Sequence, residues 1–349
     1  MKIPAFIKPG DTIAITAPSF GATTEPYISR FKEAVSRFEK RGYKVKIGQT
    51  CFLDDGKGIS TKPQTCAREL EEFYEDSSVK AIISCGGGEM MCETVGFVNF
   101  EKLKSAKPKW FLGYSDNSNF IFPLETLLDT AAIYGSCISG FGKPWELPEK
   151  YTIDLLEGKN FTVRGFDKFQ SPEAGTEAKN ADPFSKYVLT DEKHLKNFLC
   201  SDGIAKESLS EIKMSGTLCG GCLDVLENLC GTKLDGSAQF NEKYKNVIWV
   251  LEACDYNPMD IRRALWHLDQ CTWFKNASGF VIGRPLSAWK QEMMGVDQYN
   301  AVTDILEKYK VPIIMDADIG HISPTVPLVM GADAEVFAHK DEFSVKMAL

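Results

Sequence analysis

Short apolar runs alternate with amphipathic segments over the first 140 residues of the chain. The apolar runs predict β-strands over residues 12–17, 44–47, 79–84, 110–114 and 131–134. Between them, apolar side chains recur at helical spacing, which predicts helices over residues 27–41 and 65–76. This alternation predicts an α/β fold in which helices cover both faces of a mostly parallel sheet. Ligands of such sheets bind beyond the carboxyl ends of the strands.

Three loops follow predicted strands and are therefore candidate site loops. They are Pro18-Ser19, the glycine triplet Gly86-Gly87-Gly88 and the turn that carries Ser115. In the segment GYSDNSNF an apolar run ends at Gly113, and residues 116–119 have the composition of a helix start. Ser115 is thus expected on a strand-to-helix turn, where a nucleophile is held toward solvent. The alternative is that Ser115 is only a helix-capping residue.

Regular patterning weakens from residue 143 to about residue 213 and returns after it. The weak stretch is rich in Lys, Glu, Asp and Ser, and we interpret it as a connecting segment that could act as a flap. Beyond it, the pattern predicts strands over residues 216–218, 247–251, 279–282 and 312–315. It predicts helices over residues 223–229, 259–268 and 298–309.

Composition narrows the class of protein and its partners. The 349 residues are 44% hydrophobic and 25% charged, which is typical of a globular protein with ordinary cores. A net charge of −8 argues against nucleic acid or an anionic membrane as the main partner, because both need a basic surface. The opening residues lack the apolar core of a signal peptide. Eleven scattered cysteines fit reduced thiols, so we expect a cytoplasmic protein.

Two residues of the second half could act together with Ser115. Glu252 ends a fully apolar predicted strand, and His321 follows another strand in the segment DIGH. A serine hydroxyl needs a base to take its proton, and the imidazole needs a carboxylate to fix its tautomer and stabilise its charged form. The three side chains supply the parts of a serine-nucleophile triad, although Glu252 could also be a solvated strand end. Asp255 is better explained as an acid ahead of the helix at residues 259–268.

A tetrahedral oxyanion also needs backbone N–H donors, and two sources are available. One is the glycine-rich loop, and the other is the amide of Asp116 at a predicted helix start. The usual Gly-x-Ser-x-Gly pattern is absent, since Asn117 replaces the second glycine.

A different class of function is suggested by Cys219-x-x-Cys222, which precedes a predicted helix. Thiol redox proteins carry such a motif, because a helix start lowers the pKa of a thiol. The pair could also be half of a metal site with Cys230. No second C-x-x-C and no histidine cluster completes a zinc site, so we expect no metal ligands and no cofactor.

The order and content of several segments resemble the serine LD-carboxypeptidase family, which includes the microcin C immunity proteins. The resemblance covers both ends and the middle of the chain and leaves out mainly the connecting segment. The matching segments are KPGDTIAITAPS (8–19), CGGGE (85–89), FLGYSDNS (111–118), GTLCGGCLDVLENLCGT (216–232), WVLEACDYNPMDIRRALWHL (249–268), GFVIGR (279–284) and PIIMDADIGHISPTVPLVMGADAEV (312–336).

The resemblance implies a Rossmann-like domain over residues 1–142 that carries the nucleophile, followed by the connector or flap at 143–213. A smaller β-rich domain over residues 214–349 would carry the acid and the base. The implied protein is a cytoplasmic, metal-free hydrolase that is often a homodimer. Its triad falls on Ser115, Glu252 and His321, and its oxyanion donors fall on the amides of Gly87 and Asp116, with Gly86 and Gly88 beside them.

Departures from the family pattern bear on the substrate. Members that trim murein tetrapeptides commonly show an Arg-Gly-Gly-Tyr-Gly-like loop, whereas this loop has neither the arginine nor the tyrosine and ends in Glu89. The resemblance therefore favours hydrolysis of an amide that joins a peptidyl or aminoacyl group to a nucleotide. Murein tetrapeptide LD-carboxypeptidase activity in peptidoglycan recycling is the alternative.

The base-stacking tryptophan of some immunity proteins has no counterpart in the connecting segment. A phenylalanine of that segment could replace it. The candidates are Phe161, Phe166, Phe169 and Phe184.

Overall fold

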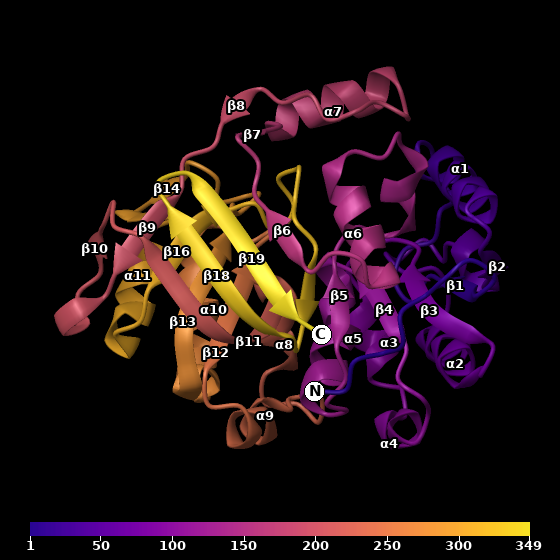
Figure 1. The fold of residues 1–349 in the computed structure, drawn as a ribbon, viewed down its shortest axis with the longest axis horizontal. Coiled ribbons are helices and arrows are strands. Elements are labelled where there is room, and N and C mark those ends of the chain that lie inside the picture. The colour runs from indigo at the N-terminus through magenta and orange to yellow at the C-terminus, as the bar shows by residue number, and fades with distance from the viewer.

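The apolar runs of the first 140 residues form one sheet in the computed structural model, which describes residues 1–349 (Figure 1). The sheet has six strands in the order β17-β5-β4-β3-β1-β2, and all neighbours are parallel except β17 with β5. Their side chains are mostly buried, as expected for strands covered on both faces. The strands are β1 (Thr12–Thr16), β2 (Lys44–Ile47), β3 (Val79–Ser84), β4 (Trp110–Gly113), β5 (Ala132–Tyr134) and β17 (Leu328–Met330).

Two groups of helices cover this sheet. Parallel crossovers are right-handed, and the chain reverses direction after β2, so α1 lies on one face and α2, α3 and α5 on the other. The reversal leaves a switch point between β1 and β3, which is where ligands of such sheets bind. The helices are α1 (Tyr27–Lys40), α2 (Pro63–Glu75), α3 (Met91–Val95), α4 (Phe100–Lys104), α5 (Ser118–Thr126) and α6 (Leu147–Glu157).

The second half of the chain builds a nine-stranded sheet in the order β10-β9-β16-β13-β12-β11-β18-β19-β6. Its central strands β11, β12, β13 and β16 are parallel, and the outer strands are antiparallel. The strands are β6 (Thr162–Arg164), β9 (Lys196–Leu199), β10 (Lys206–Glu207), β11 (Ile212–Cys222), β12 (Val247–Glu252), β13 (Ala277–Gly283), β16 (Ile313–Ala317), β18 (Asp333–His339) and β19 (Glu342–Ala348). Its helices are α8 (Leu223–Leu229), α9 (Ser237–Lys243), α10 (Pro258–Gln270) and α11 (Asn300–Leu306).

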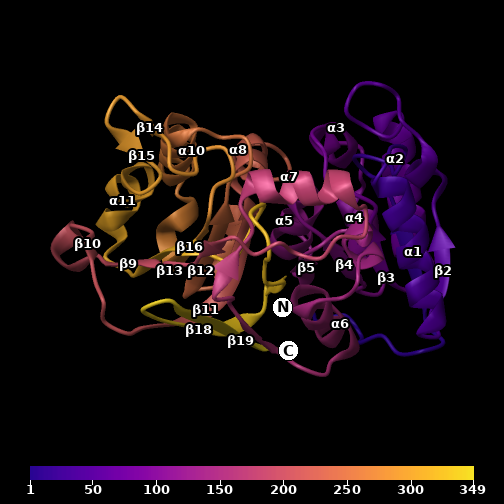
Figure 2. The ribbon, with the colours of Figure 1, turned by 90° about the horizontal axis from the view of Figure 1, so that it is seen from above.

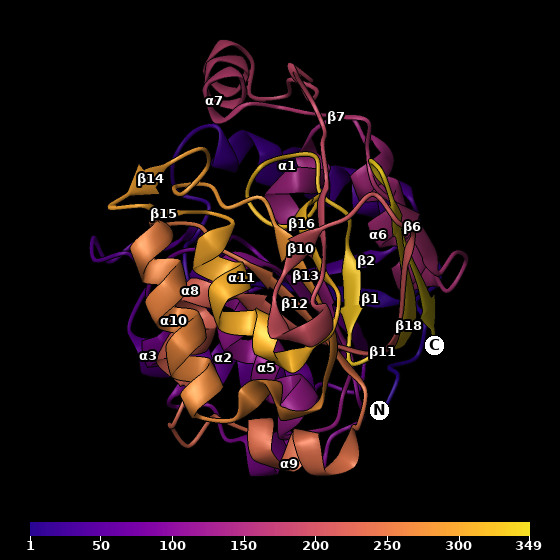
Figure 3. The same ribbon diagram turned by 90° about the vertical axis from the view of Figure 1, so that its left-hand side faces the viewer.

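The weakly patterned stretch at residues 143–213 contains more regular structure than its sequence indicates. Its strands β6 and β10 are the edge strands of the second sheet, β9 lies next to β10, and all three are too short to show a clear alternation. Between them, a two-stranded ribbon of β7 (Lys168–Phe169) and β8 (Asp191–Glu192) supports α7 (Pro172–Ala181). Helix α7 has no buried residue and lies across the junction of the two halves (Figure 2), beyond the rest of the fold (Figure 3).

The chain passes between the two sheets near its end. After β16 in the second sheet, residues 318–327 lead into β17 of the first sheet, and β18 then returns to the second. A single apolar core continues through both sheets. A small ribbon of β14 (Glu292–Met293) and β15 (Val296–Asp297) lies outside them. No helix is both long and apolar enough to cross a membrane.

The predicted fold class is confirmed. The first half has a mostly parallel, Rossmann-like sheet, and the carboxy-terminal half is rich in strands. The carboxy-terminal half nevertheless has a parallel centre with crossover helices, so both halves are built from strand–helix units.

Glu125 on α5 is fully buried between the sheets, and neither of its carboxyl oxygens has a hydrogen-bond partner. Burial therefore raises the pKa of Glu125 well above its ordinary value, although the nearby Cys219 thiol and Gly220 amide oppose this shift. The folded protein holds this proton more tightly than the unfolded chain does. The contribution of this proton to folding stability is complete at pH values below the pKa of Glu125 in the unfolded chain. It is lost as the pH rises through the pKa of Glu125 in the folded protein.

We predict that Glu125→Gln abolishes this part of the pH dependence of folding stability. In the native protein, each pKa unit by which Glu125 differs between the folded and unfolded states corresponds to about 1.4 kcal/mol of folding free energy, which is lost at high pH. Urea unfolding at several pH values measures the effect, and exposed Glu242→Gln is the matched control. Parallel stability–pH curves for the native and Glu125→Gln proteins would contradict the prediction.

Candidate active site

Ser115 lies directly beyond the carboxyl end of β4, on a 3-10 turn that leads into α5. Its backbone φ is +63°, a left-handed conformation that is uncommon for serine and is found at strained functional turns. The turn is held by the Ser115 amide, which donates to Oη of Tyr134 (3.0 Å), and by Asn117 Nδ2, which donates to the carbonyl of Gly86 (3.0 Å). The predicted strand-to-helix turn is therefore present.

Glu252 is the last residue of β12 and is 2% exposed, so it is not a solvated strand end. Its Oε1 accepts a hydrogen bond from Oη of Tyr134 (2.5 Å), and its Oε2 lies 2.8 Å from Nδ1 of His321. Asp255, in contrast, is exposed, and its backbone amide donates to Asp224. The structure thus places Glu252, and not Asp255, beside the histidine.

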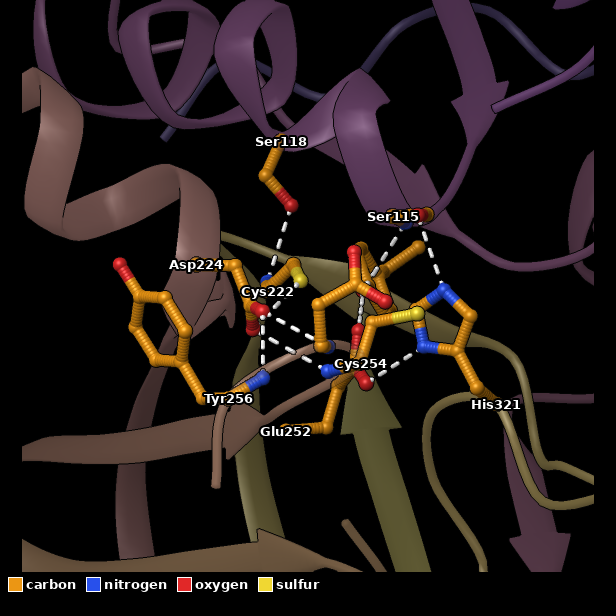
Figure 4. Close-up of polar contacts among 10 residues, drawn as sticks. Ser115, Ser118, Cys222, Asp224, Glu252, Cys254, Tyr256 and His321 are labelled. Carbon is orange, nitrogen blue, oxygen red and sulfur yellow. Dashed lines mark hydrogen bonds and ion pairs between the residues drawn. The ribbon is translucent and has the colours of Figure 1, made fainter. Parts of the chain in front are cut away.

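His321 lies in the loop that follows β16 and faces Ser115 across the junction of the two sheets (Figure 4). Its Nε2 is 2.8 Å from Oγ of Ser115, so a continuous series of hydrogen bonds joins serine, histidine and carboxylate. Gly320 makes this approach possible, because a Cβ there would lie 2.6 Å from Oε2 of Glu252.

The charges of Glu252 and His321 stabilise each other. Burial alone would raise the pKa of Glu252, but the His321 charge and hydrogen bonds from His321 and Tyr134 leave it below its ordinary value. Burial likewise lowers the pKa of His321, yet the Glu252 carboxylate outweighs it and raises that pKa well above the ordinary value. The carboxylate thus increases the proton affinity of the imidazole.

Two acids, the buried Asp318 and the partly buried Asp224, fix the loops around these residues. Asp318 accepts hydrogen bonds from Arg284 Nη2 (2.7 Å), Lys193 Nζ (3.2 Å) and the amide of Phe166, which anchors the His321 loop to β13 and to the connecting segment. Asp224 accepts from three successive amides of residues 254–256 and thereby shapes the loop after Glu252 (Figure 4).

The glycine triplet lies against the serine. A Cβ on Gly87 would come within 3.3 Å of Cβ and 3.4 Å of Oγ of Ser115, and the Gly87 amide makes no hydrogen bond within the protein. The Asp116 carboxylate accepts from Ser19 Oγ (2.5 Å) and the Met91 amide (2.9 Å), so its side chain fixes the turn. Gly86 and Gly88 line the same cleft as Gly87 and Ser115.

The cleft in front of Ser115 has a volume of about 820 Å³ and lies at the switch point of the first sheet. Gly175 and Lys179 of α7 line it, which is consistent with the predicted flap. Its other cationic residues are Arg30, Lys143 and Lys186, and its acidic residues are Asp54 and Glu89. Its aromatic residues are Phe20, Tyr27, Tyr114 and Tyr187.

The suggestion that a phenylalanine of the connecting segment contacts a base in the cleft is wrong, because none of the four lines it. Phe161 stacks on Phe6, and Phe169 is buried against Trp289. The aromatic residues that line the cleft are instead Phe20, Tyr114, Tyr27 at the start of α1, and Tyr187 of the connecting segment.

The paired cysteines of the C-x-x-C segment lie inside β11 and at the start of α8. Burial raises the pKa of both Cys219 and Cys222 well above the ordinary value for a thiol. No disulfide joins them. Their surroundings thus lack the low thiol pKa that the redox alternative requires.

Sequence reasoning missed Tyr134, Asp224, Arg284 and Asp318. Tyr134 ends a short apolar strand, where an aromatic residue carries no distinctive signal. The other three are ordinary polar residues near strand or helix ends, and only the fold shows that they hold the site together.

The fold and this arrangement of residues define a serine hydrolase of the α/β type. Family models describe its two parts: the LD-carboxypeptidase N-terminal domain matches residues 13–135, and the LD-carboxypeptidase C-terminal domain matches residues 215–336. The chain therefore belongs to the LD-carboxypeptidase family.

Two relatives are similar over almost the whole chain. The microcin C7 self-immunity protein MccF of Escherichia coli is 22% identical over 92% of this chain and 89% of its own length. The putative carboxypeptidase YocD of Bacillus subtilis is 24% identical over 95% of each chain.

Solved structures share the fold at low sequence identity. An MccF-like protein from Bacillus anthracis (20% identical) and MccF in complex with aspartyl sulfamoyl adenosine (18% identical) each give a TM-score of 0.76 over 99% of this chain and 98% of theirs. A muramoyltetrapeptide carboxypeptidase from Oxalobacter formigenes (18% identical) gives a TM-score of 0.68 over 97% of this chain and 99% of its own.

We predict that His321 titrates above its ordinary pKa of 6.5 and that Glu252→Gln lowers this pKa, because burial then acts without the opposing carboxylate. NMR titration of the imidazole signals measures both values. Asp255→Asn is the matched control and should leave the titration unchanged. A shift in Asp255→Asn but not in Glu252→Gln would contradict the assignment of the carboxylate.

Proposed function

We propose that this protein is a serine carboxypeptidase or amidase with a Ser115–His321–Glu252 triad, and that it hydrolyses an amide bond of a peptidyl- or aminoacyl-nucleotide. The observation that supports the triad most directly is the series of 2.8 Å contacts from Ser115 Oγ through the imidazole to Glu252, which opens into the cleft. Serine, base and orienting carboxylate in this geometry are the parts of a nucleophilic acyl transfer site.

In the first step, Oγ of Ser115 attacks the amide carbonyl while Nε2 of His321 takes the hydroxyl proton. Glu252 stabilises the resulting imidazolium through Nδ1, and Tyr134 holds Glu252 in place. The carbonyl oxygen becomes negatively charged, and the amides of Gly87 and Asp116 are the proposed donors to it. The C–N bond then breaks, and His321 returns the proton to the leaving nitrogen.

In the second step, a water molecule attacks the acyl group on Ser115. His321 accepts a proton from the water and then gives it to Oγ as the ester bond breaks. The acid leaves with the hydroxyl of the water, and the serine is restored. The cleft is wide enough to admit the water beside an acyl group, and α7 lies across the junction above it.

The charges and rings of the cleft support an anionic, nucleotide-like leaving group. Arg30, Lys143, Lys179 and Lys186 bring positive charge to one cleft of a protein whose net charge is −8. Phe20 and Tyr27 are 42% and 41% exposed, so their rings are available for base stacking. MccF has been solved with aspartyl sulfamoyl adenosine and with glutamyl sulfamoyl guanosine, which are ligands of this chemical kind.

Murein tetrapeptide LD-carboxypeptidase activity is the second candidate. The free carboxylate of such a peptide needs a cationic partner, and Glu89 would repel it. The cleft does contain cationic side chains from α1, α7 and the segment around Lys143, which could bind that carboxylate instead. A relative of the same fold is named as a muramoyltetrapeptide carboxypeptidase.

We predict that Ser115→Ala lowers kcat by at least about 10⁴-fold, because the acyl enzyme can no longer form. Its unfolding transition should remain that of the native protein to within about 1 kcal/mol. A serine-directed phosphonate probe should label Ser115, as shown by peptide mass spectrometry. Ser139→Ala is the matched control, since Ser139 lines the cleft without contacting His321. Undiminished labelling of Ser115→Ala would exclude Ser115 as the nucleophile.

We also predict a higher kcat/KM for an aminoacyl-sulfamoyl-adenosine than for a murein tetrapeptide. Phe20→Leu should lower the value for the nucleotide substrate by roughly 5- to 150-fold, which corresponds to the 1–3 kcal/mol of one stacked base. The change should be small for the tetrapeptide. Phe97→Leu is the control, because Phe97 is exposed (54%) but lies outside the cleft. A higher kcat/KM for the tetrapeptide would favour the second candidate.

A further inference from the structure

Three potential metal ligands meet at the ends of two packed helices. His267 and Cys271 lie four positions apart at the end of α10, where the Cys271 amide donates to the His267 carbonyl (3.0 Å), so their side chains share one face. Cys230 follows the last residue of α8. The donor atoms of the three side chains all lie within 4.8 Å of one another.

We propose that Cys230, His267 and Cys271 bind a zinc ion. Two thiolates and one imidazole suit zinc, and they suit Mg²⁺ or Ca²⁺ poorly, because those ions prefer oxygen ligands. Three protein ligands leave the fourth tetrahedral position to water. Cys271 is exposed and His267 is partly exposed, so the ion and its water reach the site from solvent, and binding releases the thiol protons.

A neighbouring carboxylate strengthens the assignment. Oε1 of Glu227 lies 3.7 Å from Nδ1 of His267, and Oε2 accepts a hydrogen bond from Oη of Tyr256 (2.5 Å). A carboxylate at the other ring nitrogen commonly orients a metal-bound imidazole, and Glu227 would have this role when the ion binds Nε2 of His267. Glu227 precedes Cys230 by three positions, so one helical segment carries both the ligand and the orienting group.

The position of the three ligands gives the ion a structural role. β11 and β12 are parallel, so their carboxyl ends lie side by side, and Glu252 is at this end of β12. α8 and α10 begin near these carboxyl ends and run in the opposite direction to the strands, so their C-terminal ends lie far from Ser115. None of the three ligands lines the cleft. The ion would join the two helix ends and raise stability without entering the hydrolysis.

Local sequence patterns did not indicate this site, since the ligands come from two helices and form no C-x-x-C pair. The expectation of no metal ligands was based on such patterns and on the resemblance to a metal-free family. The competing chemistry is a disulfide between Cys230 and Cys271, which would need an oxidant to accept two electrons and two protons.

The test uses the full-length protein, reduced and freed of metal, and titrates it with Co²⁺ and then Zn²⁺. We expect one Co²⁺ per chain with the absorption bands of tetrahedral thiolate coordination, displacement by Zn²⁺ and a higher Tm with Zn²⁺. Cys271→Ser and His267→Gln should each weaken binding by more than about 100-fold. Removing a group that only hydrogen-bonds to a metal ligand already costs up to about 100-fold in affinity, and the loss of a ligand itself should cost more. Glu227→Gln should weaken it by about 10- to 100-fold.

Cys92→Ser is the matched control, because Cys92 is an exposed thiol that is not one of the three ligands. It should leave Co²⁺ binding unchanged, and hydrolytic activity should be equal in the metal-free and zinc-bound native proteins. Absence of thiolate bands, or equal Co²⁺ affinity in the native and Cys271→Ser proteins, would overturn the proposal. So would a Cys230–Cys271 disulfide that persists in the presence of reductant.

Discussion

The buried carboxylate of Glu252 is the constraint on which the site depends. Burying a charged group costs free energy unless hydrogen-bond or ion-pair partners compensate for it. Glu252 ends a strand of the second sheet, and it has two such partners from outside that sheet. Tyr134 comes from the first sheet, and His321 comes from the passage between the two sheets. Any shift of one sheet against the other would leave this charge unpaired. The interaction that raises the pKa of His321 therefore also fixes how the two halves pack.

Strand β17 explains how His321 reaches Ser115. The chain leaves the second sheet after β16, pairs with β5 of the first sheet and returns in β18, so residues 318–327 are tied at both ends. Asp318, buried with Arg284 and Lys193, adds a third anchor. An uncompensated charge would remain if one partner were removed, which makes this cluster costly to disrupt. The histidine is thus held by backbone pairing and buried ion pairs, although it lies in a loop.

The sequence predicted the central strands closely, because buried parallel strands read as short apolar runs with clear ends. Predicted 79–84 coincides with β3, and Ser115, Glu252 and His321 each follow or end such a run. Edge strands such as β6 and β10 were missed, since two or three residues show no period. Tyr134 was missed for a different reason: its importance comes from contacts with residues far away in the sequence. The choice of phenylalanines failed because composition does not say which rings face a cavity.

Charge is distributed unevenly in a way that neither the net charge nor any local pattern reveals. The protein as a whole is acidic, yet the cleft gathers cationic side chains from α1, α7 and the segments near them. Burial lowers the pKa of Arg30 and of Lys143, which means that their charged forms gain from an anionic partner more than exposed side chains would. A cleft also concentrates the field of the charges that line it, because the protein around it has a lower dielectric constant than water. A substrate with an anionic leaving group would satisfy these cations while its scissile carbonyl lies at Ser115. The burial of these cations, which costs stability in the free protein, would then contribute to substrate binding.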